Sequence, residues 1–390
     1  MNPGPRLSVS YYGMKPICER FSVSFAYPVH FTRRVFATGN PLLASVLAKR
    51  PSPARVMIVM DSGAADATPG LAQQIKDYFD AHAGRIERVG EPLVVPGGEN
   101  AKNGWGCVRE IMSRAGRAHL DRHSTIVAVG GGCVLDMAGF AASLIHRGVR
   151  FVRIPTTVLA QNDAGVGVKN GMNDGGAKNF IGTFAPPAAV INDFEFLKTL
   201  PQGDWISGVA EAFKVAIIAD KPFFRQLCTM AHKLKKRNQA AMETVVHRTA
   251  KLHLRHIATS GDPFEFGSAR PLDFGHWAAH RLELMSNFML THGQAVAIGI
   301  ALDSTYARLK RMIPEDEHAA IIKGLTACGL PIYSPLLERP ELLDGLEQFR
   351  EHLGGKLCIT LPCPLGAKRE VHRMDTQTIR RAVAFIREAQ

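Results

Sequence analysis

Three histidines and one glutamate carry the metal chemistry that this sequence offers. His276 and His280 are four residues apart in FGHWAAH and so share one face of a helix, and THGQAVAIG supplies His292 after a break. In the apolar run ISGVAEAFKVAII, Glu211 stands three residues before Lys214. Imidazole nitrogens with a carboxylate form the ligand chemistry of zinc or a similar ion. Histidines satisfied within a core, together with a buried Glu–Lys ion pair, remain the alternative.

A glycine-rich turn offers a second kind of site. GGGCVLD contains Gly130, Gly131, Gly132 and Asp136 between the apolar run TIVAV and a helix-compatible run. Glycines at a strand-to-helix turn let backbone amides approach a pyrophosphate, and Asp136 can accept a hydrogen bond from a ribose or an amide. The spacing differs from GxGxxG, so a tight structural turn remains an alternative.

Polar residues follow three other apolar runs of strand length. Asp61 ends RVMIVMD, Glu99 and Lys102 follow PLVVPGG, and Thr156 and Thr157 end FVRIPTT. Ligands of open α/β sheets bind beyond the carboxyl ends of the strands. These residues therefore strengthen the prediction of a dinucleotide site.

The stretch QNDAGVGVKNGMNDGGAKNFIGT, residues 161–183, reads as a polar loop. It contains many glycines together with Asp163, Lys169, Lys178 and Asn179. This composition suggests a chain that wraps closely around an anion, and a flexible surface loop is the alternative.

The pattern around these residues predicts two domains. Short apolar runs separated by stretches of helical length indicate a parallel sheet with crossover helices up to about residue 200. Residues 21–36 suggest an early strand or hairpin. From about residue 201 the pattern is helical almost to the end. We expect an α/β, Rossmann-like NAD-binding domain at residues 1–200 and a mostly α-helical metal- and substrate-binding domain at residues 201–390.

Composition narrows the class of protein. The chain has 390 residues, 46% of them hydrophobic, and no apolar run of membrane-spanning length, which predicts a soluble protein without a membrane partner. Seven cysteines without a CxxC pair and no signal peptide fit a cytoplasmic location. The net charge is +12, but the basic run HKLKKR is short and aromatic content is 7%, so no nucleic-acid partner is expected.

Together these motifs resemble the sugar phosphate cyclase superfamily, whose best-known member is 3-dehydroquinate synthase. The resemblance covers residues 55–365 and rests on GGGCVLD, the PTT…D…K…KN stretch, AEAFK, FGHWAAH with THGQAVA, and LGGKLCITLP. It implies a dehydroquinate synthase-like fold, NAD, a divalent metal (zinc, with cobalt as an alternative), a phosphorylated sugar substrate and a homodimer.

The resemblance also implies a role for each residue. The metal would be held by Glu211, His276 and His292, which makes His280 a substrate or proton-relay residue. Residues matched to NAD binding or its surroundings are Asp61, Glu99, Lys102, Gly130, Gly131, Gly132, Asp136, Thr156, Thr157, Lys178 and Thr199. Residues matched to substrate binding and catalysis are Asp163, Lys169, Asn179, Lys214, Arg255, Asp273, His280 and His352, with Arg147 reaching in from the other subunit.

The chemistry implied by this family is a cyclisation with no net oxidation. NAD takes a hydride from a secondary alcohol, the neighbouring carbon becomes acidic, and phosphate leaves by β-elimination. The hydride then returns, the ring opens, and an intramolecular aldol reaction closes a carbocycle. NAD is regenerated in each turnover.

Several positions depart from 3-dehydroquinate synthases. Where these enzymes hold a substrate carboxylate, this sequence has Asp273 in place of asparagine, Arg255 in place of lysine, and Ala269 followed by Arg270 at the arginine position. A lysine near the C-terminus is lost, and His352 lies nearby. An aspartate about 4 Å from a carboxylate costs about 4 kcal/mol, which argues for a substrate without one.

The pattern of Asp273 with His352 resembles the sedoheptulose 7-phosphate cyclases, such as 2-epi-5-epi-valiolone synthases, and that branch is preferred. Gln294, in place of the usual glutamate after HG, is a further small departure. The alternatives are 3-dehydroquinate synthase activity on the carboxylated heptulosonate phosphate, a metal-dependent polyol dehydrogenase of related fold, and a non-catalytic binding protein.

Overall fold

A computed structural model describes residues 17–48, 53–175, 177–265, 271–352 and 355–389. Its first half is built on a parallel sheet with strand order β1-β9-β6-β5-β2-β3, in which β4 also pairs with β2. The strands are β1 (Val29–Thr32), β2 (Ala54–Asp61), β3 (Ile86–Arg88), β4 (Leu93–Val95), β5 (Thr125–Gly130), β6 (Arg150–Pro155) and β9 (Ala189–Asp193). The expected α/β fold class is confirmed.

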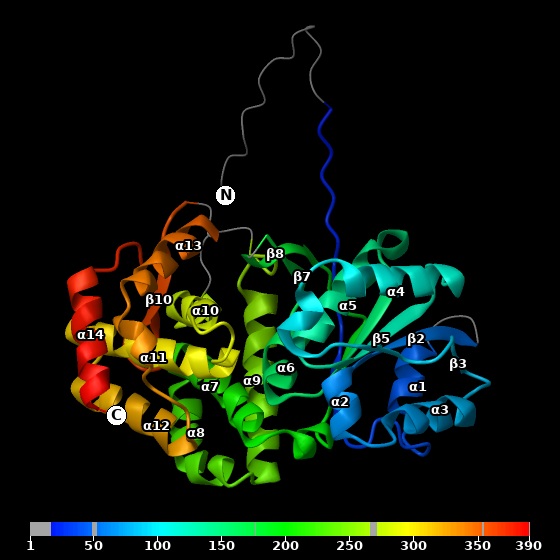
Figure 1. Ribbon diagram of the computed structural model, residues 1–390, viewed down its shortest axis with the longest axis horizontal. Coiled ribbons are helices and arrows are strands. Elements are labelled where there is room, and N and C mark those ends of the chain that lie inside the picture. The colour runs from blue at the N-terminus through cyan, green and yellow to red at the C-terminus, as the bar shows by residue number, and fades with distance from the viewer. Residues whose placement is uncertain (1–16, 49–52, 176, 266–270, 353–354, 390) are drawn as a thin grey trace, which may run out of the picture.

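Helices cover both faces of this sheet (Figure 1). The helices of this half are α1 (Leu42–Leu47), α2 (Ser62–Ala67), α3 (Leu71–Ala81), η1 (Gly98–Lys102), α4 (Gly106–Arg117), α5 (Gly132–Leu144), η2 (Ile145–Arg147), α6 (Val158–Asn162), η3 (Ala164–Val166) and η4 (Phe196–Thr199). Alternate residues of a strand point to opposite faces, so Ile58 packs in the core with α1 and α3 while Val59 packs with α4 and α5. This explains why the strands read as continuous apolar runs.

The second half is mostly helical. Its elements are α7 (Gln202–Ala219), α8 (Lys221–Lys235), α9 (Gln239–Thr259), η5 (Pro271–Asp273), α10 (His276–Met285), α11 (His292–Leu309), α12 (Glu315–Cys328), η6 (Pro335–Glu338), η7 (Pro340–Leu343), α13 (Asp344–His352), β10 (Ile359–Pro362), β11 (Lys368–Val371) and α14 (Thr376–Glu388). In Figure 1 most of these helices lie on the left and the parallel sheet on the right. The domain boundary at residue 200 stays a prediction, and α7 begins two residues beyond it.

One local expectation was wrong. Residues 161–183 do not form one polar loop, because Lys169–Asp174 (β7) and Ala177–Phe184 (β8) pair as an antiparallel hairpin. Of the early strand or hairpin that was expected, the strand is present as β1, parallel to β9. The mostly helical second half also contains the short antiparallel pair β10–β11. In the hairpin, pairing between the two strands outweighed the loop-like local composition.

None of the helices in the described residues has the length and apolar character needed to cross a bilayer.

Candidate active site

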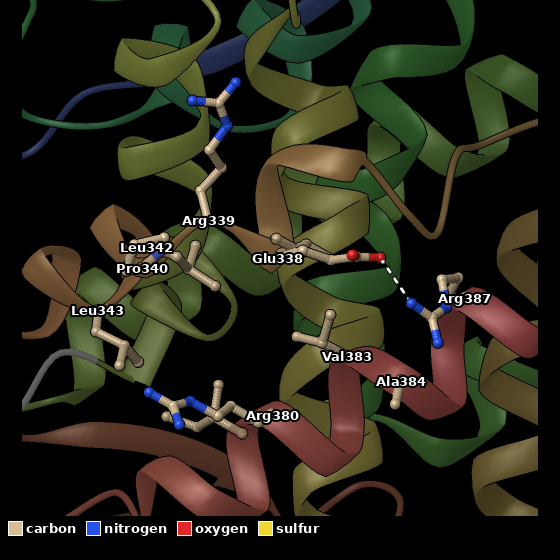
Figure 2. Close-up of a pocket in the computed structure, with 11 residues that line it drawn as sticks. Glu338, Arg339, Pro340, Leu342, Leu343, Arg380, Val383, Ala384 and Arg387 are labelled. Atoms are coloured by element: carbon tan, nitrogen blue, oxygen red, sulfur yellow. Dashed lines mark hydrogen bonds and ion pairs between the residues drawn. The ribbon is translucent and has the colours of Figure 1, made fainter.

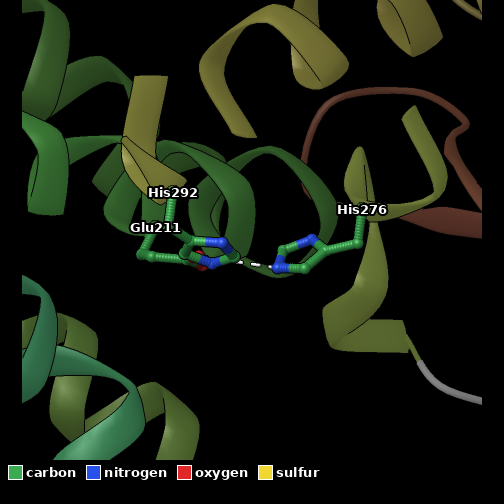
Figure 3. Close-up of side chains that lie close together, drawn as sticks. All are labelled: Glu211, His276 and His292. Carbon is green, nitrogen blue, oxygen red and sulfur yellow. Dashed lines mark ion pairs between the residues drawn. The ribbon is translucent and has the colours of Figure 1, made fainter. Parts of the chain in front are cut away.

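Helices α7, α10 and α11 bring a carboxylate and two imidazoles together. The candidate ligand atoms of Glu211, His276 and His292 lie within 4.8 Å of one another (Figure 3). His276 and His292 each start a helix, at the N-termini of α10 and α11, whereas Glu211 lies in the middle of α7. Two glycines of α11 let these helices approach closely: a Cβ on Gly293 would lie 2.1 Å from the Ser207 carbonyl oxygen, and one on Gly299 would lie 2.0 Å from that of Gly275.

The Glu211 carboxylate is fully buried. Its surroundings are cationic or imidazole: Lys214 forms an ion pair with it, and the Nε2 atoms of His292 and His276 lie 3.3 and 3.6 Å from Oε1. Burial raises the pKa of the Glu211 carboxyl, but Lys214 and the two imidazoles outweigh burial and hold it well below its usual value. An ionised, buried carboxylate beside two imidazoles fits a divalent metal such as zinc.

His280 lies beside this cluster, with its ring centroid 5.4 Å from that of His276 and 6.0 Å from that of His292. Together with Glu283, it forms an alternative group of ligand atoms around His292. Burial and the neighbouring His276 lower the pKa of His280 to about 3, so its ring is neutral near pH 7.

A cavity of about 440 Å³ opens beside these residues. It is lined from both halves of the chain. Nine of the residues singled out in the sequence line it: Asp136, Asp163, Lys169, Asn179, Lys214, Asp273, His276, His280 and His292. The structure therefore brings together the glycine-turn, hairpin and helical motifs that lie far apart in the sequence.

Charges of both signs meet inside the cavity. Lys214 lies 3.6 Å from Asp163, and Lys169 lies 2.6 Å from Glu265. Burial raises the pKa of the Asp163 carboxyl, but Lys214 outweighs it, and the pKa falls to about 2. Asp163 is therefore ionised at neutral pH and offsets the charge of Lys214.

Burial likewise raises the pKa of the Asp273 carboxyl, and Lys169 with His276 outweighs burial and lowers it below the usual value. Asp273 therefore adds a further negative charge to this cavity at neutral pH.

The glycine turn closes around Asp61 at the carboxyl end of β2. The Asp61 carboxylate accepts hydrogen bonds from the backbone amides of Gly63 at 2.8 Å and Gly131 at 3.2 Å. A Cβ on Gly130 would lie 2.7 Å from that of Asp61, so this approach requires glycine. Helix α5 starts directly after the turn and directs its N-terminus, a favourable position for a pyrophosphate, toward this edge.

The other residues matched to NAD lie along the same sheet edge, with one exception. Lys102 forms an ion pair with Asp136 at 2.9 Å, and Lys178 forms one with Glu99 at 2.9 Å. Thr156 follows β6, and the Thr157 hydroxyl caps α6 by accepting from the Ala160 amide. The exception is Thr199, which ends η4, is exposed, and donates a hydrogen bond to the Phe196 carbonyl.

Arg255 is not placed with the other predicted site residues. It is exposed on α9 and lines a separate groove with His247 and Lys251, whereas the cavity-lining residues of this helix are His253 and Ile257. The expectation that Arg255 shares the substrate site is at odds with this placement, because it lies two positions along the helix from His253 and so points to another face.

Two further expectations, for Arg147 and His352, stay predictions. Arg147 is exposed in η2 with a left-handed φ of 62°. His352 ends α13, but its side chain lies outside the described part of the chain, as do Ala269 and Arg270 altogether.

Three residues of the site escaped sequence reasoning. His253 donates or accepts through Nδ1 at 2.8 Å from Asp163, Glu265 pairs with Lys169, and Glu283 lies 3.2 Å from His292 Nδ1. For Glu283 a signal existed, because it follows His276 by seven residues and His280 by three and so shares their helical face. His253 and Glu265 had no comparable pattern.

The fully buried Arg153 positions the start of the hairpin. Its guanidinium donates to the carbonyl oxygens of Gly167 and Lys169, each at 2.9 Å, and to the Asn170 side chain at 2.7 Å. Arg153 therefore holds in place the segment that presents Lys169 to the cavity.

A second groove, of about 280 Å³, lies between η6, η7 and α14 (Figure 2). Its lining combines apolar side chains with arginines, including an ion pair of 3.2 Å between Glu338 and Arg387. The residues that line it include none of those singled out for catalysis or cofactor binding.

The two halves of the chain, with their parallel sheet and their helical Glu–His–His cluster, each match a family of known enzymes. Residues 92–207 match the family described as 3-dehydroquinate synthase N-terminal, and residues 208–349 match 3-dehydroquinate synthase C-terminal. The chain belongs to the 3-dehydroquinate synthase family. This confirms the resemblance and the expected class of enzyme, a carbon–oxygen lyase.

Relatives within this family carry more than one name. A 2-epi-5-epi-valiolone synthase of Streptomyces glaucescens is 33% identical over 351 residues, which is 90% of this chain and 87% of that protein. A 3-dehydroquinate synthase of Azotobacter vinelandii is 36% identical over 277 residues, 70% of this chain and 75% of that protein.

Among solved structures, a 2-epi-5-epi-valiolone synthase of Streptomyces hygroscopicus subsp. jinggangensis with NAD+ and Zn2+ bound has a TM-score of 0.86 and 28% identity. The match covers 96% of this chain and all (100%) of that one. A 2-deoxy-scyllo-inosose synthase with NAD+ and Co2+, at 24% identity and a TM-score of 0.74 over 92% of this chain and 96% of that one, supports the fold.

Proposed function

We propose that this enzyme is an NAD- and metal-dependent sugar phosphate cyclase that converts a heptulose phosphate, sedoheptulose 7-phosphate, to a carbocyclic cyclitol with release of phosphate. The observation that carries the proposal is the cavity in which Asp136 of the α/β half faces the histidine cluster of the helical half. The 2-epi-5-epi-valiolone synthases among its relatives support this substrate class. The division into an NAD-binding domain at 1–200 and a metal- and substrate-binding domain at 201–390 is part of the proposal.

The metal would be held by Glu211, His276 and His292. When bound, it would polarise the oxygen of the reacting carbonyl, and bound NAD would accept and return the hydride. The buried Glu211 carboxylate, which lies against Lys214 and the two imidazoles, supports this assignment.

Side chains of the cavity would bind the substrate and move its protons. Lys169, Lys214 and Asn179 would bind the phosphate, because charge-assisted hydrogen bonds favour an anion there. His280 would serve as the substrate or proton-relay residue that the resemblance implies, because its ring lies beside the metal cluster, with its centroid 5.4 Å from that of His276. Asp163 would hold the reacting hydroxyls, with His253 fixing the carboxylate at 2.8 Å.

Two carboxylates support a substrate that lacks a carboxylate of its own. Asp273 and Glu265 both line the cavity, and the Lys169 ammonium lies 2.6 Å from Glu265. A substrate carboxylate would have to compete with Glu265 for this lysine and would be repelled by Asp273. The 3-dehydroquinate synthase reaction is the second candidate, because several 3-dehydroquinate synthases are at least 32% identical to this chain.

The test is incubation with NAD+ and Zn2+ and either sedoheptulose 7-phosphate or the carboxylated heptulosonate phosphate. Phosphate release and the NMR spectrum of the product are measured. Turnover of the carboxylated substrate alone would replace the first candidate by the second. Stoichiometric NADH formation from a polyol would instead identify a dehydrogenase.

Two variants test the metal assignment. His276→Ala should lose Zn2+ binding, whereas His280→Ala should retain Zn2+ and lose turnover. Loss of the metal from both variants would contradict the separate role of His280.

We also propose a homodimer in which Arg147 of each subunit serves the partner's site. Its exposed position in η2 supports this role. Light scattering gives the oligomeric state. Mixing Arg147→Ala with His280→Ala protein should restore part of the activity through mixed dimers, and no recovery in mixed dimers would contradict the shared site.

A further inference from the structure

One buried carboxylate joins the metal cluster to the opposite half of the molecule. Glu283 lies on α10, on the helical face that carries His276 and His280, and is 2% exposed. Its two oxygens have different partners. One lies 3.2 Å from His292 Nδ1, and the other accepts from Lys178 Nζ at 2.9 Å.

The contact with His292 sets the direction of the imidazole ring. Nδ1 faces Glu283, and Nε2 lies 3.3 Å from Glu211 Oε1, inside the metal cluster. A histidine that binds a metal through one nitrogen usually donates its other N–H to a carboxylate or carbonyl, which fixes the ring and its tautomer. Glu283 is in the position of that acceptor.

The contact with Lys178 reaches across to the α/β half. Lys178 lies on β8, and its ammonium also pairs with Glu99 of η1 at 2.9 Å and lies 5.4 Å from the centre of the Phe288 ring. Glu99 in turn accepts a hydrogen bond of 2.9 Å from Asn173. An unbroken chain of polar contacts therefore runs from Glu211 to the edge of the parallel sheet.

We propose that Glu283 is a positioning residue that couples binding of the metal to binding of NAD, by holding His292 and Lys178 with one carboxylate. The inference rests on the proposed function, which assigns the metal to His292, and on the NAD contact that the family resemblance implies for Lys178. When a metal fixes His292 Nε2, the Nδ1–H is fixed toward Glu283, and the other oxygen of Glu283 then holds Lys178 in place. Coupling of this kind is reciprocal, so NAD raises the affinity for the metal by the same factor.

Glu283→Gln tests this coupling with little change of volume. The amide still accepts a hydrogen bond from His292, but it carries no charge to balance Lys178. Loss of such a supporting carboxylate lowers metal affinity by about 10- to 100-fold. Glu317→Gln is the matched control, because Glu317 on α12 is also a mostly buried glutamate paired with a lysine, Lys221, at 2.7 Å.

The affinity for Zn2+ is measured by competition with a chromophoric chelator, with and without NAD+. The affinity for NAD+ is measured by calorimetry, with and without Zn2+, and the thermal midpoint is recorded for each protein. In the wild type each ligand should bind more tightly when the other is present. In Glu283→Gln both affinities should fall and this mutual gain should disappear, whereas Glu317→Gln should keep both affinities and the gain.

Lys178→Met provides the second variant, should Glu283→Gln fail to fold. It leaves the metal cluster intact, yet the inference requires that its affinity for Zn2+ no longer depends on NAD+. A mutual gain of wild-type size in either variant overturns the inference and leaves the proposed function standing. Wild-type protein that binds neither Zn2+ nor NAD+ overturns both.

Discussion

Replacing Asp273 with asparagine should change which substrate this enzyme accepts. The Asp273 side chain lines the cavity, and its lowered pKa keeps it ionised at neutral pH. The cation that influences it most, Lys169, lies 2.6 Å from a second carboxylate, Glu265. A carboxylate placed beside Asp273 would therefore be repelled.

The size of the effect follows from the charge that is removed. Two unit charges about 4 Å apart repel by about 4 kcal/mol at an effective dielectric of about 20. Since about 1.4 kcal/mol corresponds to a tenfold change, Asp273→Asn should raise kcat/KM for the carboxylated heptulosonate phosphate by up to about a thousandfold. The value for sedoheptulose 7-phosphate should fall or stay unchanged, because no repulsion is relieved.

The assay is phosphate release from each substrate, expressed as a ratio of the two kcat/KM values. Asp220→Asn is the control, because Asp220 pairs with Arg248 at 2.9 Å and lines a different groove. The ratio should move only in Asp273→Asn. The same ratio in wild type and in Asp273→Asn would refute the electrostatic account of substrate choice.

Three further predictions concern residues around and away from the site. Gly293→Ala places a Cβ 2.1 Å from the Ser207 carbonyl oxygen, so α7 and α11 must separate. We expect the free energy of unfolding to fall by about 1 to 3 kcal/mol and Zn2+ to bind more weakly. The control is Gly106→Ala, because a Cβ at Gly106 meets open space. Arg255→Ala should leave kcat/KM for phosphate release unchanged, since its side chain lines another groove; a large loss would return Arg255 to the substrate site. Burial lowers the pKa of His318 from 6.5 to about 4. Between these pH values the unfolded state binds more protons than the folded state, so the free energy of unfolding falls as the pH drops from 6.5 toward 4. The loss is up to about 3 kcal/mol. His318→Gln should reduce that acid-side loss in chemical denaturation measured at several pH values, and an unchanged pH profile would contradict it.

Much of the fold follows from local patterns. Apolar runs such as TIVAV become central strands because both faces of a parallel sheet are buried. The pattern failed at residues 161–183, where glycines indicated a loop but β7 and β8 pair with one another. That hairpin depends on contacts such as those of Arg153, which come from a strand outside the segment.

In the candidate site, too, some features follow from local sequence patterns and others depend on tertiary contacts. Residue types and spacing were sufficient to single out one glutamate and three histidines, Glu211, His276, His280 and His292. The family resemblance then implied that Glu211, His276 and His292 form the ligand set, and their ligand atoms do lie together. Residue types and spacing could not show that Arg255 faces away from the cavity. The match of Arg255 to one position of a motif does not show which face of α9 is directed toward the cavity.

Sequence alone determined the class of chemistry, through the glycine turn, the histidines and the polar residues after the strands. Tertiary structure decided which of the charged side chains form ion pairs with one another. Lys169 pairs with Glu265, which is 96 positions away in the sequence. Lys178 pairs with Glu283, which is 105 positions away. These contacts form because the sheet and the helices pack against each other. Spacing along the sequence shows which side chains share a face of one helix or strand, but it does not show which side chains of two separate elements meet.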